Sequence, residues 1–233
     1  MPKRRYAAPS KKRRPKRQRR SSNVYKKNLA RNITRNIVPN SKVVKLRYCT
    51  TISRNPALGV ASTYIFRANS LFDPDFSSIG HQPMGFDQWA TFYDHYTVVG
   101  SKITANFMSS NSSATTGSAI VGVYLKDSSA AITDVTTLME QTNVGYKVMT
   151  ASAAGQKATV SKGFSTKKFF GIRDIRDNRQ LLGAPMSQNP TEDAYFHVFV
   201  GPTDGGTDPD TVHIVVTIEF MAILTERKAL GQS

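Results

Sequence analysis

Short runs of alternating apolar and polar residues make up most of the chain from residue 41 onward. In the run 44–52, apolar and aromatic residues alternate with Lys45, Arg47 and Cys49, and this period of two places one set on a buried face of a strand. Similar runs, rich in Val, Ile, Thr, Tyr and Phe and bounded by Gly, Pro, Asn, Asp and Ser, occupy 60–66, 98–107, 119–125, 157–164, 194–200 and 212–224, with a weaker run at 144–150. Eight strands with some long connections predict an all-β fold, an eight-stranded sandwich or jelly roll and not a simple meander, with short helices in its long loops.

Two insertions between the strands carry helical patterns. The loop 71–88 ends in aromatic residues spaced three and four apart from Phe86 onward, which predicts one face of a short helix with Asp87 capping its start. The stretch 132–141 predicts another helical turn. Large aromatic side chains often anchor interfaces, so we expect four of them to pack against the sandwich or a neighbouring subunit: Trp89, Phe92, Tyr93 and Tyr96.

Charge is divided unevenly along the chain, which has a formal net charge of +16. Residues 1–72 contain 20 Lys and Arg and no acidic residue, whereas residues 73–233 contain 12 Lys and Arg against 16 Asp and Glu. The chain therefore joins a cationic N-terminal part to a nearly neutral remainder. Such an asymmetry indicates a polyanionic partner, most often a nucleic acid.

The cationic part is densest at 3–20, where 11 of 18 residues are Lys or Arg. This segment has too few apolar groups to offset the entropy lost on ordering, so we expect it to be disordered when unbound. At 24–38, apolar and basic side chains each recur every four residues, which predicts a short amphipathic helix ended by Pro39. We therefore divide the chain into a basic arm (1–40), a jelly-roll domain (41–226) and a C-terminal tail (227–233).

The arm is the predicted nucleic-acid-binding element. Lys and Arg neutralise phosphates and release counterions without reading base sequence, and Arg also stacks on unpaired bases. The residues predicted to do this are Lys3, Arg4, Arg5, Lys11, Lys12, Arg13, Arg14, Lys16, Arg17, Arg19, Arg20, Lys26, Lys27, Arg31 and Arg35. A nuclear localisation signal needs the same residue types, and the run at 11–20 fits one through Lys11, Lys12, Arg13, Arg14, Lys16, Arg17, Arg19 and Arg20.

No pattern of catalytic residues accompanies these features. The 4 His are scattered without paired-ligand spacing, and the sequence has neither a Gly-x-Ser-x-Gly motif nor a Walker loop, so we do not expect an enzyme. Cys49 is the single cysteine, which excludes an intrachain disulfide and a Cys-based zinc site. The acidic stretches 73–75 and 204–210 contain oxygen ligands of the type that calcium prefers, but Asp, Gly and Pro in such clusters usually form turns, and we predict no metal and no cofactor. The longest apolar run, 212–224, is too short and too often interrupted to insert in a membrane.

One stretch of the sequence resembles a known family. HQPMGFDQWATFYDHYTVVGSKITANF, at 81–107, places an aromatic turn directly before the strand VVGSKITANF and resembles the capsid proteins of circoviruses and related small circular single-stranded DNA viruses. The Arg-rich start, the strand YIFRANSLFDPD and the closing strand TVHIVVTIEFMAIL follow the order of that family. The resemblance implies a single jelly roll, a T=1 shell of sixty subunits, arms turned inward onto DNA, and entry into the host nucleus.

The predicted function is that of a structural capsid protein that binds copies of itself and packages circular single-stranded DNA. Its expected locations are the virion and, during assembly, the host nucleus, where nuclear import receptors would be further partners; no cell-surface receptor can be named. A coat protein of a small positive-strand RNA or satellite virus is an alternative, because nothing in the arm reads a 2′-hydroxyl. A cellular basic nucleic-acid-binding protein is a weaker alternative, because such proteins usually carry basic residues on the folded body as well.

Overall fold

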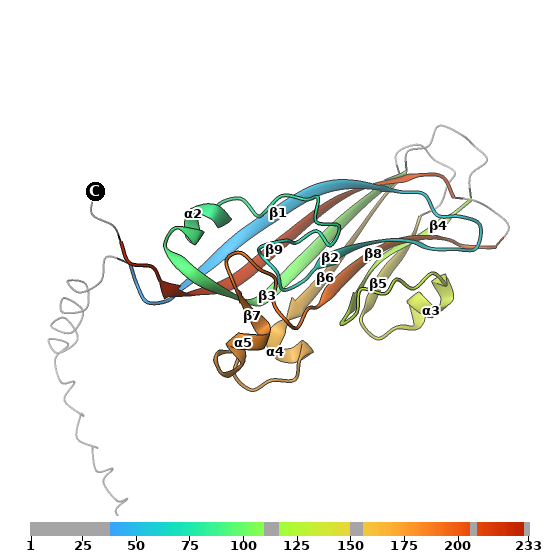
Figure 1. The fold of residues 1–233 in the computed structure, drawn as a ribbon. Coiled ribbons are helices and arrows are strands. Elements are labelled where there is room, and N and C mark those ends of the chain that lie inside the picture. The colour runs from blue at the N-terminus through green and yellow to red at the C-terminus, as the bar shows by residue number, and fades with distance from the viewer. Residues whose placement is uncertain (1–37, 110–116, 150–155, 206–208, 231–233) are drawn as a thin grey trace, which may run out of the picture. The chain divides into compact units, whose positions relative to one another are not determined.

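The structure, a computed structural model, describes residues 38–109, 117–149, 156–205 and 209–230 (Figure 1). Within these ranges the chain is mainly strand, and its helical segments are short. The strands are β1 (Lys42–Arg54), β2 (Ser62–Arg67), β3 (Tyr93–Ser109), β4 (Ala119–Lys126), β5 (Val144–Met149), β6 (Lys157–Ser165), β7 (Gly183–Pro185), β8 (Tyr195–Pro202) and β9 (Val212–Arg227). The helical segments are α2 (Phe86–Ala90), α3 (Val135–Glu140), α4 (Thr166–Phe169), the 3-10 turn η1 (Arg176–Asn178) and α5 (Arg179–Leu182). None of these described helices is long and apolar enough to cross a membrane.

The strands form two antiparallel sheets that face each other. The first sheet has the order β1-β9-β3-β6, with the short β7 also paired to β3, and the second has the order β2-β8-β4-β5. The chain passes back and forth between the sheets, and its first strand, β1, pairs along its whole length with its last strand, β9. This connectivity is that of a jelly roll. The predicted fold class is confirmed, and each of the eight predicted strands corresponds to one of the observed long strands.

The main core lies between the two sheets. On β1 and β9 every second side chain is buried for most of the strand, as the period of two requires. Several of the largest side chains of this core come from both sheets and are almost completely buried, among them Tyr48, Phe66, Phe107, Phe196 and Phe220. Aromatic groups of this size contribute much of the apolar area that stabilises a sandwich.

A second apolar cluster covers the outer face of the second sheet. There α3 places Val135 and Leu138 against Ile120 and Phe199. The helical turn predicted at 132–141 is confirmed, and Asp134 caps it by accepting a hydrogen bond from the Thr137 amide at 2.6 Å. Because α3 covers this outer face, β8 is buried on both sides, whereas the outer face of the first sheet carries many exposed side chains.

The helix predicted for the aromatic stretch is wrong in its extent. α2 ends at Ala90, and Tyr93 and Tyr96 belong to β3 instead of continuing a helical face. Tyr93 pairs with Arg227 of β9, and Tyr96 and the three residues after it are β-formers, so pairing with a long neighbouring strand overrides the helical spacing.

The predicted cap of α2 is also wrong. Gly85, with φ of 87°, occupies the N-cap position, and Asp87 lies within the first turn. This left-handed conformation is readily adopted by glycine and costs most other residues energy, which explains why the chain has glycine there.

Candidate nucleic-acid interface

The basic residues predicted to bind nucleic acid, at 3–35, lie outside the residues that the structure describes. The same holds for the nuclear-localisation run at 11–20 and for the predicted helix at 24–38 as far as residue 37. These assignments stay predictions, and so do the boundaries drawn between arm, domain and tail. The described body contributes a separate set of candidate residues.

The described chain begins at one end of the sandwich, next to α2 and the last residues of β9. Arg227 donates a hydrogen bond from Nη1 to the Val38 carbonyl at 3.0 Å, and the Tyr93 hydroxyl donates to the Pro39 carbonyl at 2.9 Å. Both bonds fix the backbone just before β1 starts. Any segment that precedes Val38 therefore leaves the body from this anchored point.

Three basic side chains project from the outer face of the first sheet. Lys45 and Arg47 lie on β1, on the opposite side from its buried residues, and the strand register aligns Arg47 with Glu219 of β9 and Glu219 with Lys102 of β3. The Arg47 guanidinium donates to Glu219 at 2.8 Å, yet these two side chains remain 65% and 54% exposed. Exposed ion pairs contribute little to stability, so this one orients Arg47 without removing it from solvent.

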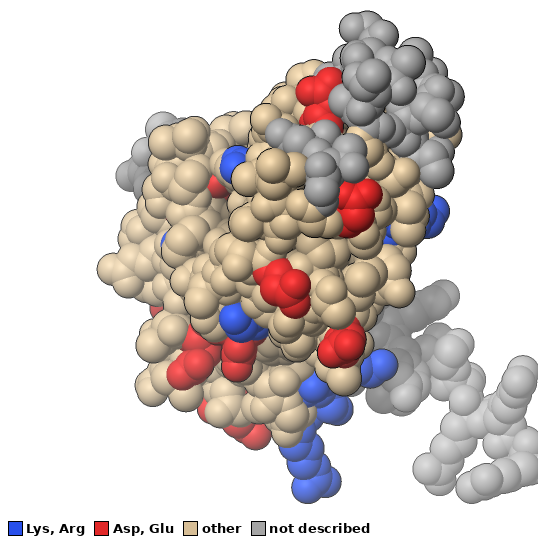
Figure 2. Space-filling view, turned by 90° about the vertical axis from the view of Figure 1, so that its right-hand side faces the viewer, with Lys and Arg blue, Asp and Glu red and all other residues tan. Residues whose placement is uncertain are grey.

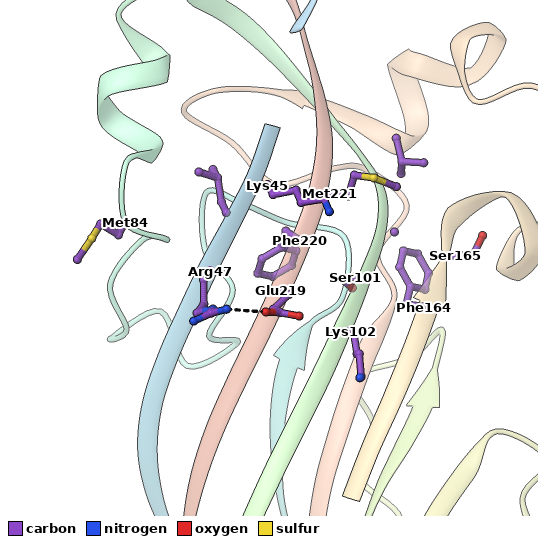
Figure 3. A pocket seen from close by; sticks show the side chains of 13 residues that line it. Lys45, Arg47, Met84, Ser101, Lys102, Phe164, Ser165, Glu219, Phe220 and Met221 are labelled. Atoms are coloured by element: carbon purple, nitrogen blue, oxygen red, sulfur yellow. Dashed lines mark hydrogen bonds and ion pairs between the residues drawn. The ribbon is translucent and has the colours of Figure 1, made fainter. Parts of the chain in front are cut away.

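These side chains surround an open hollow of about 810 Å³ (Figure 3). Gly100 forms part of the lining, where β3 has an irregular register against β9. A Cβ atom at Gly100 would lie 2.9 Å from the Phe164 carbonyl oxygen of β6, so the close approach of these strands requires glycine. The lining combines three cations, one carboxylate and two thioethers: Lys45, Arg47, Lys102, Glu219, Met84 and Met221.

Farther along the same face, short polar side chains bond across the strands. The hydroxyls of Thr104 and Ser161 lie 3.0 Å apart, and Thr159 donates to the Asn106 side-chain oxygen at 2.8 Å. Pairs of this kind stabilise a sheet modestly and leave its surface hydrated. The cationic hollow is thus continuous with a polar surface.

The four aromatic residues predicted to pack lie in two different settings. Tyr93 and Tyr96 are completely buried inside their own subunit, where Tyr96 donates to the Gln188 carbonyl at 2.9 Å. Burial raises the pKa of Tyr96 to about 12. Trp89 packs partly against the core with its ring 6.3 Å from that of Tyr93, and Phe92 is 39% exposed. A neighbouring subunit could reach Phe92 and the outer part of Trp89, but not the two tyrosines.

An arginine fixes the long β2–β3 loop to the body. Arg67 donates from Nη1 to Asp73 at 3.0 Å and from Nε to Asp193 at 3.3 Å, and its guanidinium lies 4.9 Å from the centre of the Phe76 ring. The Arg67 side chain is 11% exposed. Burial raises the pKa of Asp193, and the neighbouring Arg67 opposes this rise. This contact therefore holds carboxylates in a setting that they would otherwise avoid.

The acidic stretch 73–75 helps to hold the β2–β3 loop in place. Asp75 accepts hydrogen bonds from the Tyr64 hydroxyl at 2.8 Å and from the Ser77 amide at 2.9 Å, as a turn-forming aspartate does. Among the described residues, no group of three or more His, Cys, Asp or Glu is placed to hold a metal ion. The second stretch, 204–210, includes residues 206–208, which are outside the described part of the chain.

Two exposed apolar sites are candidates for contacts between proteins. On the β2–β3 loop, Ile79 and Met84 are 86% and 89% exposed. The loop between them is tied to β1, because the His81 ring nitrogen Nε2 lies 3.0 Å from the Cys49 carbonyl oxygen. On the edge strand β5, Tyr146 and Val148 are both exposed. Large apolar groups that a folded chain presents to water in this way often mark an interaction surface.

Charge differs between surfaces of the body. At the end of the sandwich on the right of Figure 1, Asp and Glu are scattered across the surface, and Lys and Arg are seen mainly toward its lower margin (Figure 2). Three of the exposed acidic side chains of the body, Asp127, Asp134 and Glu140, lie in the β4–β5 connection. The three cations of the hollow are thus a local feature of the first sheet.

Sequence reasoning did not single out Lys45, Arg47 and Lys102 as a group. The alternation in 44–52 carries a signal for the first two, because it places them opposite the core residues. Lys102 joins them only through the pairing of β1 with β9 and of β9 with β3, for which the sequence has no local signal.

Several solved structures are similar to the described fold. The structure of cocksfoot mottle virus has 11% identity and a TM-score of 0.45, with 98% of this chain and 97% of that chain covered. The 60-mer BFDV capsid protein has 10% identity and a TM-score of 0.44, with coverage of 83% and 97%, and tobacco necrosis virus has 13% identity and a TM-score of 0.44, with coverage of 83% and 86%. No protein-family model and no curated protein matches the sequence.

Proposed function

We propose that this chain is the capsid protein of a small virus, with a jelly-roll body that builds the shell and a basic arm that binds the packaged nucleic acid. The observation that carries this proposal is that most of the net positive charge lies in the sequence before the first strand of the folded body. Residues 1–40 contain 15 Lys and Arg and no acidic residue, whereas residues 41–233 contain 17 against 16. A protein that binds nucleic acid mainly through its folded surface would concentrate cations on that surface. Here most of the excess of Lys and Arg over Asp and Glu precedes the first strand.

Self-association is supported by the exposed apolar side chains of the body. Ile79 on one loop and Tyr146 with Val148 on an edge strand would each be removed from contact with water if a second copy covered them. Identical subunits that meet through two different surfaces form rings or closed shells when the rotation closes. The two sites lie on different strands and loops, as such contacts require.

The sequence resemblance supports the finer parts of the proposal. It favours a T=1 shell of sixty subunits, a circular single-stranded DNA genome and import into the host nucleus through the run at 11–20. Sixty arms with 15 cations each would neutralise on the order of a thousand phosphates, which is the scale of a small genome. The same charge would suit an RNA genome, so the nucleic acid has to be identified directly.

Replacing the eight Lys and Arg of 11–20 with Gln tests the arm. We expect the variant to form particles with strongly reduced nucleic-acid content, because the body supplies the subunit contacts and the arm supplies the phosphate contacts. The absorbance ratio at 260 and 280 nm of particles purified by size-exclusion chromatography measures this content. A control with the same ten residues in scrambled order keeps the charge and should package normally.

Full nucleic-acid content in the Gln variant would remove the arm from the mechanism. Full-length protein that stays monomeric in the presence of nucleic acid, with no shells visible by electron microscopy, would refute the capsid function itself. Digestion of nucleic acid extracted from particles with DNase or RNase then separates the DNA genome from the RNA alternative.

A further inference from the structure

We propose that the hollow on the outer face of the first sheet is a second nucleic-acid contact, in which Lys45, Arg47 and Lys102 bind phosphates of a single strand. The inference rests on the proposed function, since it takes a nucleic acid as the partner, and it goes further by stating which face of the body is turned toward that partner. The arm alone would leave the orientation of the body undetermined.

The spacing of the three cations suits an extended sugar–phosphate backbone. Lys45 and Arg47 are two residues apart on β1, which corresponds to about 7 Å along a strand. Arg47 and Lys102 are separated by the width of β9, which corresponds to about 10 Å between strands. Each cation can therefore contact a different phosphate, and Figure 3 shows Arg47, Glu219 and Lys102 side by side across the sheet.

The negative charge of Glu219 opposes the binding of a polyanion in the hollow. It is the one carboxylate among the residues that line the hollow, so the lining has two more positive than negative charges. Its ion pair with Arg47 is exposed and therefore weak, and a phosphate can compete for the same guanidinium. Removal of this carboxylate should strengthen the binding of nucleic acid, whereas removal of the three cations should weaken it.

The apolar part of the lining suits the rest of a nucleotide. Met84 is 89% exposed, and Met221 is also exposed, so two flexible thioethers flank the cations. Methionine adapts its shape to whatever it contacts, and such a surface accepts sugars and bases without selecting a sequence. The hollow is open to solvent, so a single strand of nucleic acid can pass across it.

The position of the hollow agrees with the point where the basic segment joins the body. Pro39 is anchored by Tyr93, and Lys45 follows it by six residues, which is at most about 20 Å along an extended chain. Cations before and after Pro39 in the chain can thus bind the same nucleic-acid strand, and together they bind it more tightly than either group alone.

Lysine footprinting on the full-length chain tests the inference. Unassembled protein is treated with a lysine-acylating reagent with and without a twenty-nucleotide oligo(dT), and modification is read by mass spectrometry. We expect the oligonucleotide to lower the acylation of Lys45 and Lys102 at least threefold and to leave Lys147, exposed on the second sheet, unchanged. Equal reactivity of Lys45 and Lys102 with and without oligo(dT) would overturn the proposal.

A triple variant, K45Q/R47Q/K102Q, measures the same contact by salt dependence. The loss of three phosphate contacts should reduce the slope of log K against log salt by about 2 and weaken oligo(dT) binding roughly 10- to 100-fold near 0.1 M salt. The matched control K147Q/K167Q/K168Q removes three exposed lysines outside the hollow and should change the slope by much less. Glu219→Gln should strengthen binding about threefold.

These outcomes separate the inference from the proposed function. A chain that forms shells but shows equal slopes for the two triple variants refutes the hollow and leaves the capsid function standing. A chain that never assembles but shows protected Lys45 and Lys102 refutes the capsid function and supports the hollow. Protection of the two lysines by assembly alone, without any nucleic acid, would mean that a second copy covers this face, and would also refute the proposal.

Discussion

Replacement of Arg67 with Met should destabilise the body more than any exposed charge change. Arg67 is 11% exposed and donates to two carboxylates, Asp73 at 3.0 Å and Asp193 at 3.3 Å. Removal of one partner from a buried ion pair costs about 3–5 kcal/mol because the other charge stays behind without compensation. Since these side chains retain some contact with water, we expect a somewhat smaller cost than that range, about 2–4 kcal/mol.

Asp193 makes this prediction sharper. Burial is the largest influence on its pKa and raises it, so the ionised carboxylate depends on Arg67 for its stability. Asp193→Asn alone should therefore cost little, and R67M/D193N should recover about 1–2 kcal/mol of the loss in R67M. The non-additivity of the two changes measures their interaction directly.

Urea unfolding of unassembled full-length protein provides the assay, with the fluorescence of Trp89, the one tryptophan of the chain, as the signal. Arg47→Met is the matched control, because Arg47 makes a single exposed ion pair and should change stability by less than about 1 kcal/mol. If R67M and R47M unfold at the same urea concentration, or if D193N worsens R67M, then the arginine does not hold the loop as described.

Two further predictions concern pH and packing. Burial lowers the pKa of both His95 and His197 in the folded chain. The unfolded chain, in which the pKa of histidine is about 6.5, therefore binds more protons than the folded chain near and below that pH. The free energy of unfolding should consequently fall as the pH drops from 7.5 to 5.5. The urea midpoint at the two pH values measures this fall, and in H95Q/H197Q it should shrink; an equal fall in that variant would point to other groups. Gly122→Ala should cost about 1–3 kcal/mol, because its Cβ would lie 2.7 Å from a backbone oxygen and against the Phe199 ring. Gly163→Ala, with nothing within 4 Å of the new atom, should stay within about 0.5 kcal/mol in thermal or urea unfolding.

The sequence predicts the sandwich well because most strands have one face toward a core. β1 shows this clearly, since its alternation of side chains is also its alternation of burial. At the start of β3 the spacing of the aromatic residues predicts a helix instead. No period of two opposes that prediction there, because Tyr96, Thr97 and Val98 are all buried. β7 has three residues, too few for any period, and its place beside β3 depends on a contact that is remote in the sequence.

The candidate site could be predicted only in part, for a related reason. Which residues of β1 face away from the core follows from local alternation, but the strands that complete the hollow are brought together by register. Glu219 and Lys102 are separated from Arg47 by long stretches of chain and meet it only because β9 pairs with both β1 and β3. A charge pattern along the sequence cannot indicate such a meeting, whereas the high density of Lys and Arg in residues 1–40 is visible from composition alone.

The arrangement of charge on the body has a consequence for assembly. In a shell whose first sheets all faced inward, every copy would add Lys45, Arg47 and Lys102 to a shared interior, along with the cations of its arm. Like charges in water repel by about 1 kcal/mol at 4 Å, and this repulsion extends over a screening length of about 8–10 Å. Apolar contacts through sites such as Ile79 and Tyr146 would have to overcome that repulsion in an empty shell. Because a nucleic acid would neutralise the same cations, its binding and the closure of the shell would favour each other, even though they would use different residues.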